Sequence, residues 1–92
     1  MIQSFNCSDT DALFHSQSVP RFKNIERVAR RKLLQINAAT ELSSLRVPPG
    51  NQLEALTRDR KGQHSIRIKD QWRICFVWRG DSAYKVEIVD YH

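Results

Sequence analysis

The chain has 92 residues, of which 40% are hydrophobic and 27% are charged. This size and composition fit a single globular domain with one hydrophobic core. Fifteen lysines and arginines outnumber ten acidic residues, which gives a formal net charge of +5 and a pI near 9.7. Such a chain favours an anionic partner, such as a nucleic acid, an acidic protein or an anionic membrane surface.

The sequence disfavours secreted, membrane-spanning and metal-binding proteins. Its first residues lack the basic flank and apolar run of a signal peptide, and no apolar run is long enough to span a bilayer. We therefore expect a cytoplasmic protein. Cys7 and Cys75 have no metal-ligand spacing. The alternatives are one disulfide between them or two free thiols, and a reducing compartment favours free, partly buried thiols. No base marks Cys75 as a nucleophile. With three scattered histidines, we expect neither a metal nor another cofactor.

The N-terminal half of the chain predicts a short strand followed by two helices. Residues 1–7 form an extended segment that fits the edge of a sheet. The polar residues 8–11 offer N-caps for a short helix, which residues 16–20 interrupt. Apolar side chains then recur at helical spacing in a main helix over about residues 24–39, with basic side chains on its outer face.

The C-terminal half predicts four strands. Residues 52–57 form the first strand, and residues 64–69 and 72–79 form a hairpin, because two sets of side chains alternate along both segments. The apolar set belongs to the covered face of the sheet and the cationic set to the open face. A last strand spans residues 83–90, and alternation places three of its side chains on one face, namely Tyr84, Val86 and Ile88.

Together these elements predict one α+β domain over residues 1–92. The N-terminal strand and two helices are expected to pack on one face of a mostly antiparallel, four- to five-stranded sheet. The helices cover the apolar side of the hairpin, and its cationic side is left open. This open face is where we expect the function of the chain to lie.

All of the formal net charge lies in residues 58–79, where seven basic side chains accompany two acidic ones; the rest of the chain carries eight of each. Arg67, Lys69 and Arg73 fall on the open face of the predicted hairpin. Guanidinium groups bind phosphates through paired hydrogen bonds, so this face suits a phosphate-bearing partner. The alternative is that the basic side chains only confer solubility, but the scarcity of acids in this stretch favours anion binding.

Two further features offer groups that transfer protons. The last strand leads directly into Asp90, Tyr91 and His92, and histidine titrates near neutral pH. Strict alternation separates Tyr91 from its two neighbours, so the chain has to twist if all three serve one site. Glu54 lies on the strand before the hairpin, and alternation leaves open whether it faces the basic side. The alternative for the tail is a frayed terminus without a role.

Several motifs taken together resemble the HigB-type toxins of the RelE superfamily. They are the run Leu56-Thr57-Arg58-Asp59-Arg60-Lys61-Gly62, then His64-Ser65-Ile66, Gln71-Trp72-Arg73-Ile74 and the terminal Asp90-Tyr91-His92. The similarity extends over essentially the whole chain, including the opening Met1-Ile2-Gln3-Ser4-Phe5. The combination is fairly specific for this family, whereas the single motifs are not.

The resemblance implies a RelE-like microbial RNase fold and a bacterial type II toxin that cleaves mRNA in the ribosomal A site. It implies a metal-independent endoribonuclease, which a HigA-like helix-turn-helix antitoxin neutralises. The expected partners are thus the antitoxin, the ribosome and mRNA. Operator DNA is contacted only indirectly, through the antitoxin complex that represses its own operon, and no membrane is involved.

The resemblance also assigns roles to individual residues. Arg73 matches the arginine that contacts the reacting phosphate, and Asp90, Tyr91 and His92 match functional residues at the C-terminus. Some branches of the superfamily pair a strand glutamate as base with a C-terminal histidine as acid. We therefore expect Glu54 as the base, Arg73 as the phosphate clamp and His92 as the acid. Tyr91 would orient or assist, and Asp90 would hold the tail in place or tune His92.

Two departures from the best-studied branch keep other functions open. That branch has a histidine at the position of Glu54 and a lysine at the position of Thr57. One alternative is a non-catalytic protein that binds RNA or the ribosome and inhibits by occupancy. The other is a chain that serves mainly as the antitoxin's partner and operon co-repressor. Five basic side chains are expected to bind the mRNA or rRNA backbone: Arg58, Arg60, Lys61, Arg67 and Lys69.

Overall fold

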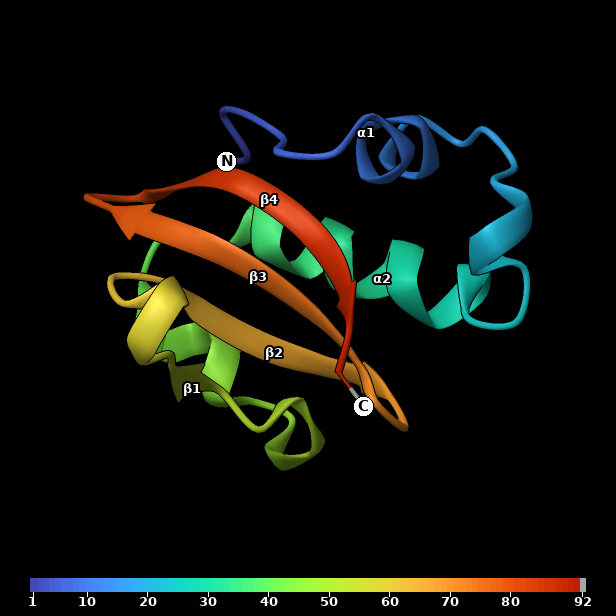
Figure 1. The fold of residues 1–92 in the computed structure, drawn as a ribbon. Coiled ribbons are helices and arrows are strands. Elements are labelled where there is room, and N and C mark those ends of the chain that lie inside the picture. Colours follow the sequence, from blue (N-terminus) through green and yellow to red (C-terminus); the bar gives the residue numbers. More distant parts are fainter. Residues whose placement is uncertain (92) are drawn as a thin grey trace.

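The computed structural model describes residues 1–91, and its elements follow one another in the predicted order. Two helices, α1 (Ser8–Phe14) and α2 (Glu26–Ala38), precede four strands, β1 (Glu54–Ala55), β2 (His64–Lys69), β3 (Trp72–Arg79) and β4 (Ser82–Asp90). The strands form one antiparallel sheet in the order β1-β2-β3-β4 (Figure 1). Short 3-10 turns lie between these elements: η1 (Pro20–Phe22), η2 (Leu42–Arg46), η3 (Pro49–Asn51) and η4 (Arg58–Arg60).

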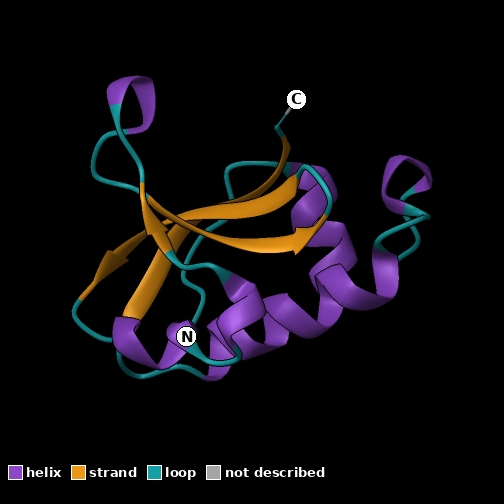
Figure 2. Cartoon of the chain, turned by 90° about the horizontal axis from the view of Figure 1, so that it is seen from below, coloured by secondary structure: helices purple, strands orange, loops and turns teal. Residues whose placement is uncertain are grey.

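The helices cover one face of the sheet, which confirms the predicted α+β architecture (Figure 2). Apolar side chains from both layers meet in one core, whose fully buried members include Phe22, Leu33, Ile66, Ile74 and Phe76. Helices α1 and α2 leave the other face of the sheet open, and turn η4 protrudes on that side (Figure 2). Within residues 1–91, no helix is both long enough and apolar enough to cross a bilayer.

Helix α2 packs on the sheet through one face, as predicted. Ala29, Leu33 and Ile36 are buried and recur every three to four residues, which is the spacing of a single helix face. The helix begins at Glu26, slightly later than predicted, because residues 20–22 form the 3-10 turn η1 and residues 23–25 form a further turn. Lys32 also lies on the buried side of the helix, which the predicted pattern of apolar residues did not reveal.

The polar residues 8–11 do not cap α1 as predicted, because they lie within the helix. The N-cap position is Cys7, and no side chain caps the helix there. Thr10 is instead fully buried, and its Oγ1 accepts a hydrogen bond of 3.0 Å from the backbone N–H of Ile88. Asp9 and Asp11 lie in the first helical turn, where negative charge interacts favourably with the helix dipole. The polar run therefore supports α1 through charge and ties it to β4.

The N-terminal segment lies at an edge of the sheet, as predicted, and this edge is β4, with which it pairs only locally. Ile2 forms an isolated parallel bridge with Ala83, and Phe5 forms another with Val86. Backbone hydrogen bonds of 2.8 to 3.0 Å join the two segments. A covered edge of this kind is protected from pairing with another chain.

Strand β1 is much shorter than the predicted strand over residues 52–57. Gln52 and Arg58 both have left-handed backbones, with φ values of 46° and 56°. The chain therefore leaves the extended conformation at both ends of the segment. Only Glu54 and Ala55 remain to pair with β2, which leaves the flanking backbone free to make other contacts.

The prediction that Tyr84 shares a face with Val86 is wrong, because β4 contains a β-bulge. The register of β4 against β3 shifts at this point, and Lys85 takes a left-handed φ of 54°. The extra residue reverses the alternation. Ala83 consequently lies in the core, and Tyr84 turns to the other side, where the guanidinium of Arg79 lies 5.6 Å from the centre of its ring.

We expect Lys85→Gly to stabilise the protein by about 1 kcal/mol, because glycine adopts a left-handed backbone without the steric cost of a Cβ atom. Lys69→Gly is the matched control, since Lys69 is also an exposed strand lysine and its φ is not positive. There glycine should lower the free energy of unfolding by about 0.5–1 kcal/mol. Urea unfolding followed by circular dichroism measures both values, and equal losses in the two variants would contradict the bulge.

Candidate active site

The open face of the sheet holds Arg73 in a fixed orientation. Its Nε donates a hydrogen bond of 2.7 Å to Ser65 Oγ on β2, and its Nη2 donates one of 2.6 Å to the backbone carbonyl of Gln52. The Arg73 side chain is only 11% exposed. Hydrogen bonds within residues 1–91 engage Nε and Nη2 of Arg73 but not Nη1. Nη1 is therefore left for an incoming anion. Both of these acceptors are neutral, so the hydrogen bonds that fix the guanidinium do not compensate its positive charge.

Glu54 lies on the same face as Arg73. It pairs in register with Ser65, and directly paired residues of antiparallel strands point to the same side of a sheet. Its Oε1 is 4.0 Å from Arg73 Nη2, and its side chain is 57% exposed. The orientation that alternation left open is therefore toward the basic side. A solvent-accessible carboxylate in this position can accept a proton from a ligand bound at Arg73.

Tyr91 reaches back over the open face from the end of β4. Its backbone N–H donates a hydrogen bond of 2.8 Å to the carbonyl of Gln71, which ties the tail to the β2–β3 turn. Its hydroxyl lies 3.6 Å from Sγ of Cys75. Burial raises the pKa of Tyr91, and the contact with Cys75 raises it further. The phenol therefore stays protonated at neutral pH and can donate a hydrogen bond.

Cys75 forms part of the floor beneath this site. It is fully buried, and burial raises the pKa of its thiol although the contact with Tyr91 and the charge of Arg60 act in the opposite direction. The thiolate is the nucleophilic form of cysteine, and a buried thiol with a raised pKa supplies little of it. This environment agrees with the prediction that Cys75 is not a nucleophile.

The structure gathers only part of the predicted tail around Arg73. The Tyr91 hydroxyl contacts Cys75, which lies on the same side of β3 as Arg73, so Tyr91 belongs to the open face. Asp90 is half-buried and pairs in register with Trp72, which packs on the helical layer. Asp90 therefore starts from the other side of the strand. The predicted acid, His92, lies outside the described residues.

The predicted RNA-contacting residues differ in how free their side chains are. Arg58, Lys61 and Lys69 are exposed, and none of the ion pairs among residues 1–91 involves them. Arg67 is half-buried, and its Nε donates a hydrogen bond of 3.4 Å to the carbonyl of Asp70. The first group is therefore available to an anionic partner, whereas Arg67 is partly engaged by the hairpin turn.

Arg60 is held more firmly than the other predicted RNA contacts. Its Nη1 donates hydrogen bonds of 2.8 Å to Glu87 Oε1 and 3.2 Å to Gln63 Oε1. It borders a shallow pocket of about 290 Å³ between η4 and the C-terminal tail, lined by Leu56, Thr57, Arg58, Asp59, Arg60 and Tyr91. Tyr91 connects this pocket to the open face, because it lines the pocket and contacts Cys75.

Three groups in this site were not predicted from the sequence. Ser65 shares the alternation of Arg73 within the hairpin, so its contact with the guanidinium could have been inferred. Glu87 forms an ion pair with Arg60. This pair could not be predicted from alternation, because the bulge in β4 shifts the register of that strand. The Gln52 contribution is a backbone carbonyl, and the sequence carries no signal for it.

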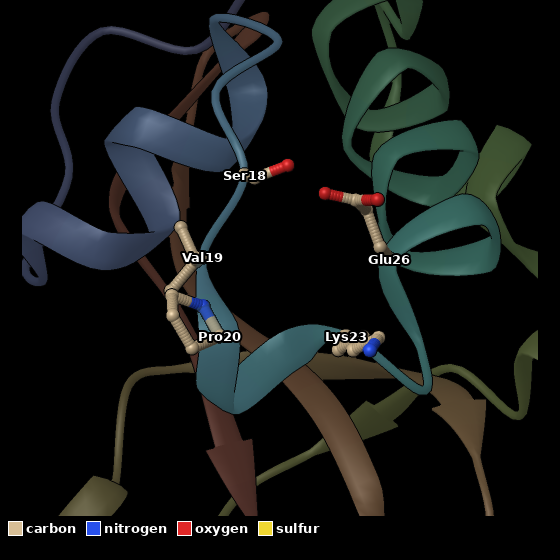
Figure 3. A pocket seen from close by; sticks show the side chains of 5 residues that line it. All are labelled: Ser18, Val19, Pro20, Lys23 and Glu26. Atoms are coloured by element: carbon tan, nitrogen blue, oxygen red, sulfur yellow. The ribbon is translucent and has the colours of Figure 1, made fainter.

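A separate cavity of about 400 Å³ lies in the helical layer, between the segment after α1 and the start of α2. It is lined by Ser18, Val19, Pro20, Lys23 and Glu26. The Ser18 hydroxyl and the Glu26 carboxylate point toward each other across it (Figure 3). No strand residue lines it, and its carboxylate disfavours a phosphate. Within residues 1–91, no three His, Cys, Asp or Glu side chains form a group able to hold a metal ion.

Comparison with known proteins identifies the family. The family model described as the RelE-like toxin of the type II toxin–antitoxin system HigB matches residues 6–92. Toxin HigB-1 of Vibrio cholerae is 46% identical over 55 residues, which are 60% of this chain and 58% of that protein. Endoribonuclease HigB of Proteus vulgaris is 34% identical over 95 residues, and the match covers 100% of both chains. This chain therefore belongs to the HigB family of RelE-like toxins, the toxin components of type II toxin–antitoxin systems.

Proposed function

We propose that this toxin is a metal-independent endoribonuclease that cleaves mRNA in the ribosomal A site and thereby inhibits translation. The observation that carries the proposal is the Arg73 guanidinium, which two neutral acceptors orient on an open cationic face. A cation fixed in advance stabilises the charge that develops on a reacting phosphate. The relative that matches over its full length bears the name Endoribonuclease HigB, which supports the same chemistry here.

The proposed reaction uses the 2′-OH of the RNA as its nucleophile. Glu54 accepts the 2′-OH proton, the 2′-oxygen bonds to the adjacent phosphorus, and the bond from phosphorus to the 5′-oxygen breaks. Arg73 stabilises the pentacoordinate phosphate, and His92 donates a proton to the leaving 5′-oxygen with assistance from Tyr91. Asp90 holds the tail or tunes His92. The products are a 2′,3′-cyclic phosphate and a 5′-OH.

We assign the ribosome the task of ordering the mRNA on this site. Glu54 is 57% exposed, so we expect little cleavage of naked RNA by the free toxin. Ordering of the reactants supplies a large part of the rate enhancement in such reactions. The exposed cations Arg58, Lys61 and Lys69 are placed to contact the RNA backbone, with further contacts from Arg60 and Arg67.

The partner proteins follow from the two-component system. A toxin of a type II system acts together with an antitoxin, which we propose to be a HigA-like helix-turn-helix protein. The toxin then reaches operator DNA only through the antitoxin complex. Since its substrate is mRNA on ribosomes, we place the toxin in the cytoplasm.

Mapping mRNA 5′ ends after a short pulse of expression tests the proposal. The toxin should produce new 5′-OH ends at codon-phased positions, and Arg73→Ala should lower their yield by about 100-fold or more. Arg79→Ala is the matched control, because Arg79 lies at the exposed end of β3 over the Tyr84 ring, and it should cleave normally. Growth arrest with intact messages would contradict cleavage and indicate that the toxin inhibits by occupancy. Absence of toxicity would indicate a role as co-repressor. New 5′ ends without codon phase would contradict the dependence on the ribosome.

The role of Glu54 can be separated from binding in a single-turnover assay on ribosomes programmed with mRNA. Glu54→Gln keeps the shape of the side chain but removes the base, so the cleavage rate at saturation should fall by about 10²–10⁴-fold. The half-saturating toxin concentration should stay the same. Glu41→Gln, at an exposed carboxylate beside η2, serves as control. A wild-type rate for Glu54→Gln would exclude Glu54 as the base.

Cys75 gives a prediction for alkaline pH. Burial raises the pKa of its thiol, so the unfolded chain loses this proton at a lower pH than the native protein does. As the pH rises above the ordinary thiol pKa of 9.0, ionisation of Cys75 stabilises the unfolded state relative to the native state, and the free energy of unfolding falls. The difference in free energy of unfolding between wild type and Cys75→Ala should therefore shrink from pH 8 to pH 10, while the Cys75→Ala variant still cleaves mRNA. Loss of cleavage by Cys75→Ala at an unchanged melting temperature would instead give the thiol a chemical role.

A further inference from the structure

A buried polar pair joins helix α2 to the turn before β1. Lys32 is 7% exposed, and its ammonium group donates a hydrogen bond to Asn51 Oδ1. Asn51 is fully buried, and its amide nitrogen donates to the carbonyls of Leu45 and Val47 at 3.1 and 3.3 Å and to Gln35 Oε1 at 3.2 Å. Asn51 thus binds helix α2 on one side and the backbone around η2 on the other.

The next residue along the chain carries this anchor into the candidate active site. Gln52 has a left-handed backbone with φ 46° and ψ 57°, and its N–H donates a hydrogen bond of 3.0 Å to the carbonyl of Pro49. Its own carbonyl accepts the 2.6 Å hydrogen bond from Arg73 Nη2. The position of that carbonyl is therefore set by the backbone on either side of it, and Asn51 fixes the preceding peptide.

Stability alone does not account for a lysine and an asparagine at these positions. A buried ammonium group destabilises a fold unless it is hydrogen-bonded, and burial lowers the pKa of Lys32 accordingly. Apolar side chains of similar volume often replace buried charged groups without loss of stability. An apolar pair cannot donate hydrogen bonds to the carbonyls of Leu45 and Val47 while it is held by helix α2, and this is how the Lys32–Asn51 pair fixes the turn.

We propose that Lys32 and Asn51 are positioning residues, which set the orientation of the Arg73 guanidinium through the Gln52 carbonyl. The inference rests on the proposed function, in which Arg73 binds the reacting phosphate. Ser65 fixes Nε of the guanidinium, and the Gln52 carbonyl fixes Nη2. Two fixed nitrogens define both the plane and the direction of the group, so Nη1 points to one place. Without the Lys32–Asn51 pair, one of these two acceptors loses its support.

Single-turnover cleavage on programmed ribosomes tests this role with Lys32→Met and Asn51→Ala. Each variant should lose about 10- to 100-fold in the rate at saturation, because misplacement of a reacting group by about 1 Å has effects of this size. The half-saturating concentration should change less than about twofold, since the exposed cations are untouched. Leu13→Ala, in the core on α1, is the control for general destabilisation, and assays run well below all melting temperatures. Rates equal to that of Leu13→Ala at matched loss of melting temperature would overturn the proposal.

A second measurement reports on Arg73 without using cleavage. Nitrogen-15 relaxation of Arg73 Nε should show an ordered side chain in the wild type and in Leu13→Ala, and a more mobile one in Lys32→Met. An unchanged order parameter in Lys32→Met would also overturn the proposal. Failure of the proposed function is distinguishable, because it appears as intact mRNA with the wild-type toxin or as normal cleavage by Arg73→Ala, whereas the order parameter of Arg73 still tests the positioning role. Failure of the positioning role alone leaves Arg73→Ala inactive and Lys32→Met at the rate of the Leu13→Ala control.

Discussion

The open face of this toxin depends on how one guanidinium is anchored. Arg73 stands on β3, its Nε is held by a side chain of β2, and its Nη2 is held by the backbone before β1. A free arginine side chain loses rotational entropy when it binds a ligand, and here folding has already ordered it. The two acceptors come together only when the sheet and the loop before β1 are both in place. The cationic site is therefore a property of the folded chain and not of its basic composition.

Small side chains beneath the site make this anchoring possible. Ser65 and Cys75 are cross-strand neighbours and are both fully buried, although they lie on the face that the helices leave open. They are covered by the longer side chains of Arg73 and Tyr91, each of which contacts one of them. A large side chain at either position would lift the covering group away from the sheet. The open face thus has a packed floor of its own.

Helical spacing in the N-terminal half and alternation in the C-terminal half were sufficient to predict the fold class, and alternation placed Arg73 opposite the core. It failed at Tyr84, because the bulge at Lys85 reverses the two faces of β4, and a single extra residue leaves no periodic signal. It was also silent about Gln52, whose part in the site is a carbonyl. Lys32 was hidden for a related reason: a lysine within a basic helix is expected to face solvent, and only the position of Asn51 shows why this one does not.

The two guanidinium groups near Tyr91 differ in the charge of their acceptors, and this difference suits them to different tasks. Arg60 donates to the carboxylate of Glu87 at 2.8 Å, so much of its charge is compensated within the protein. Arg73 donates to a hydroxyl and a carbonyl, and the carboxylate of Glu54 lies 4.0 Å away with its side chain 57% exposed, where water screens the attraction. A phosphate that reaches the open face has to compete with a carboxylate at Arg60 but meets little competition at Arg73. Arg60 is thus better placed to shape the pocket beside Tyr91, and the reacting phosphate is directed to Arg73.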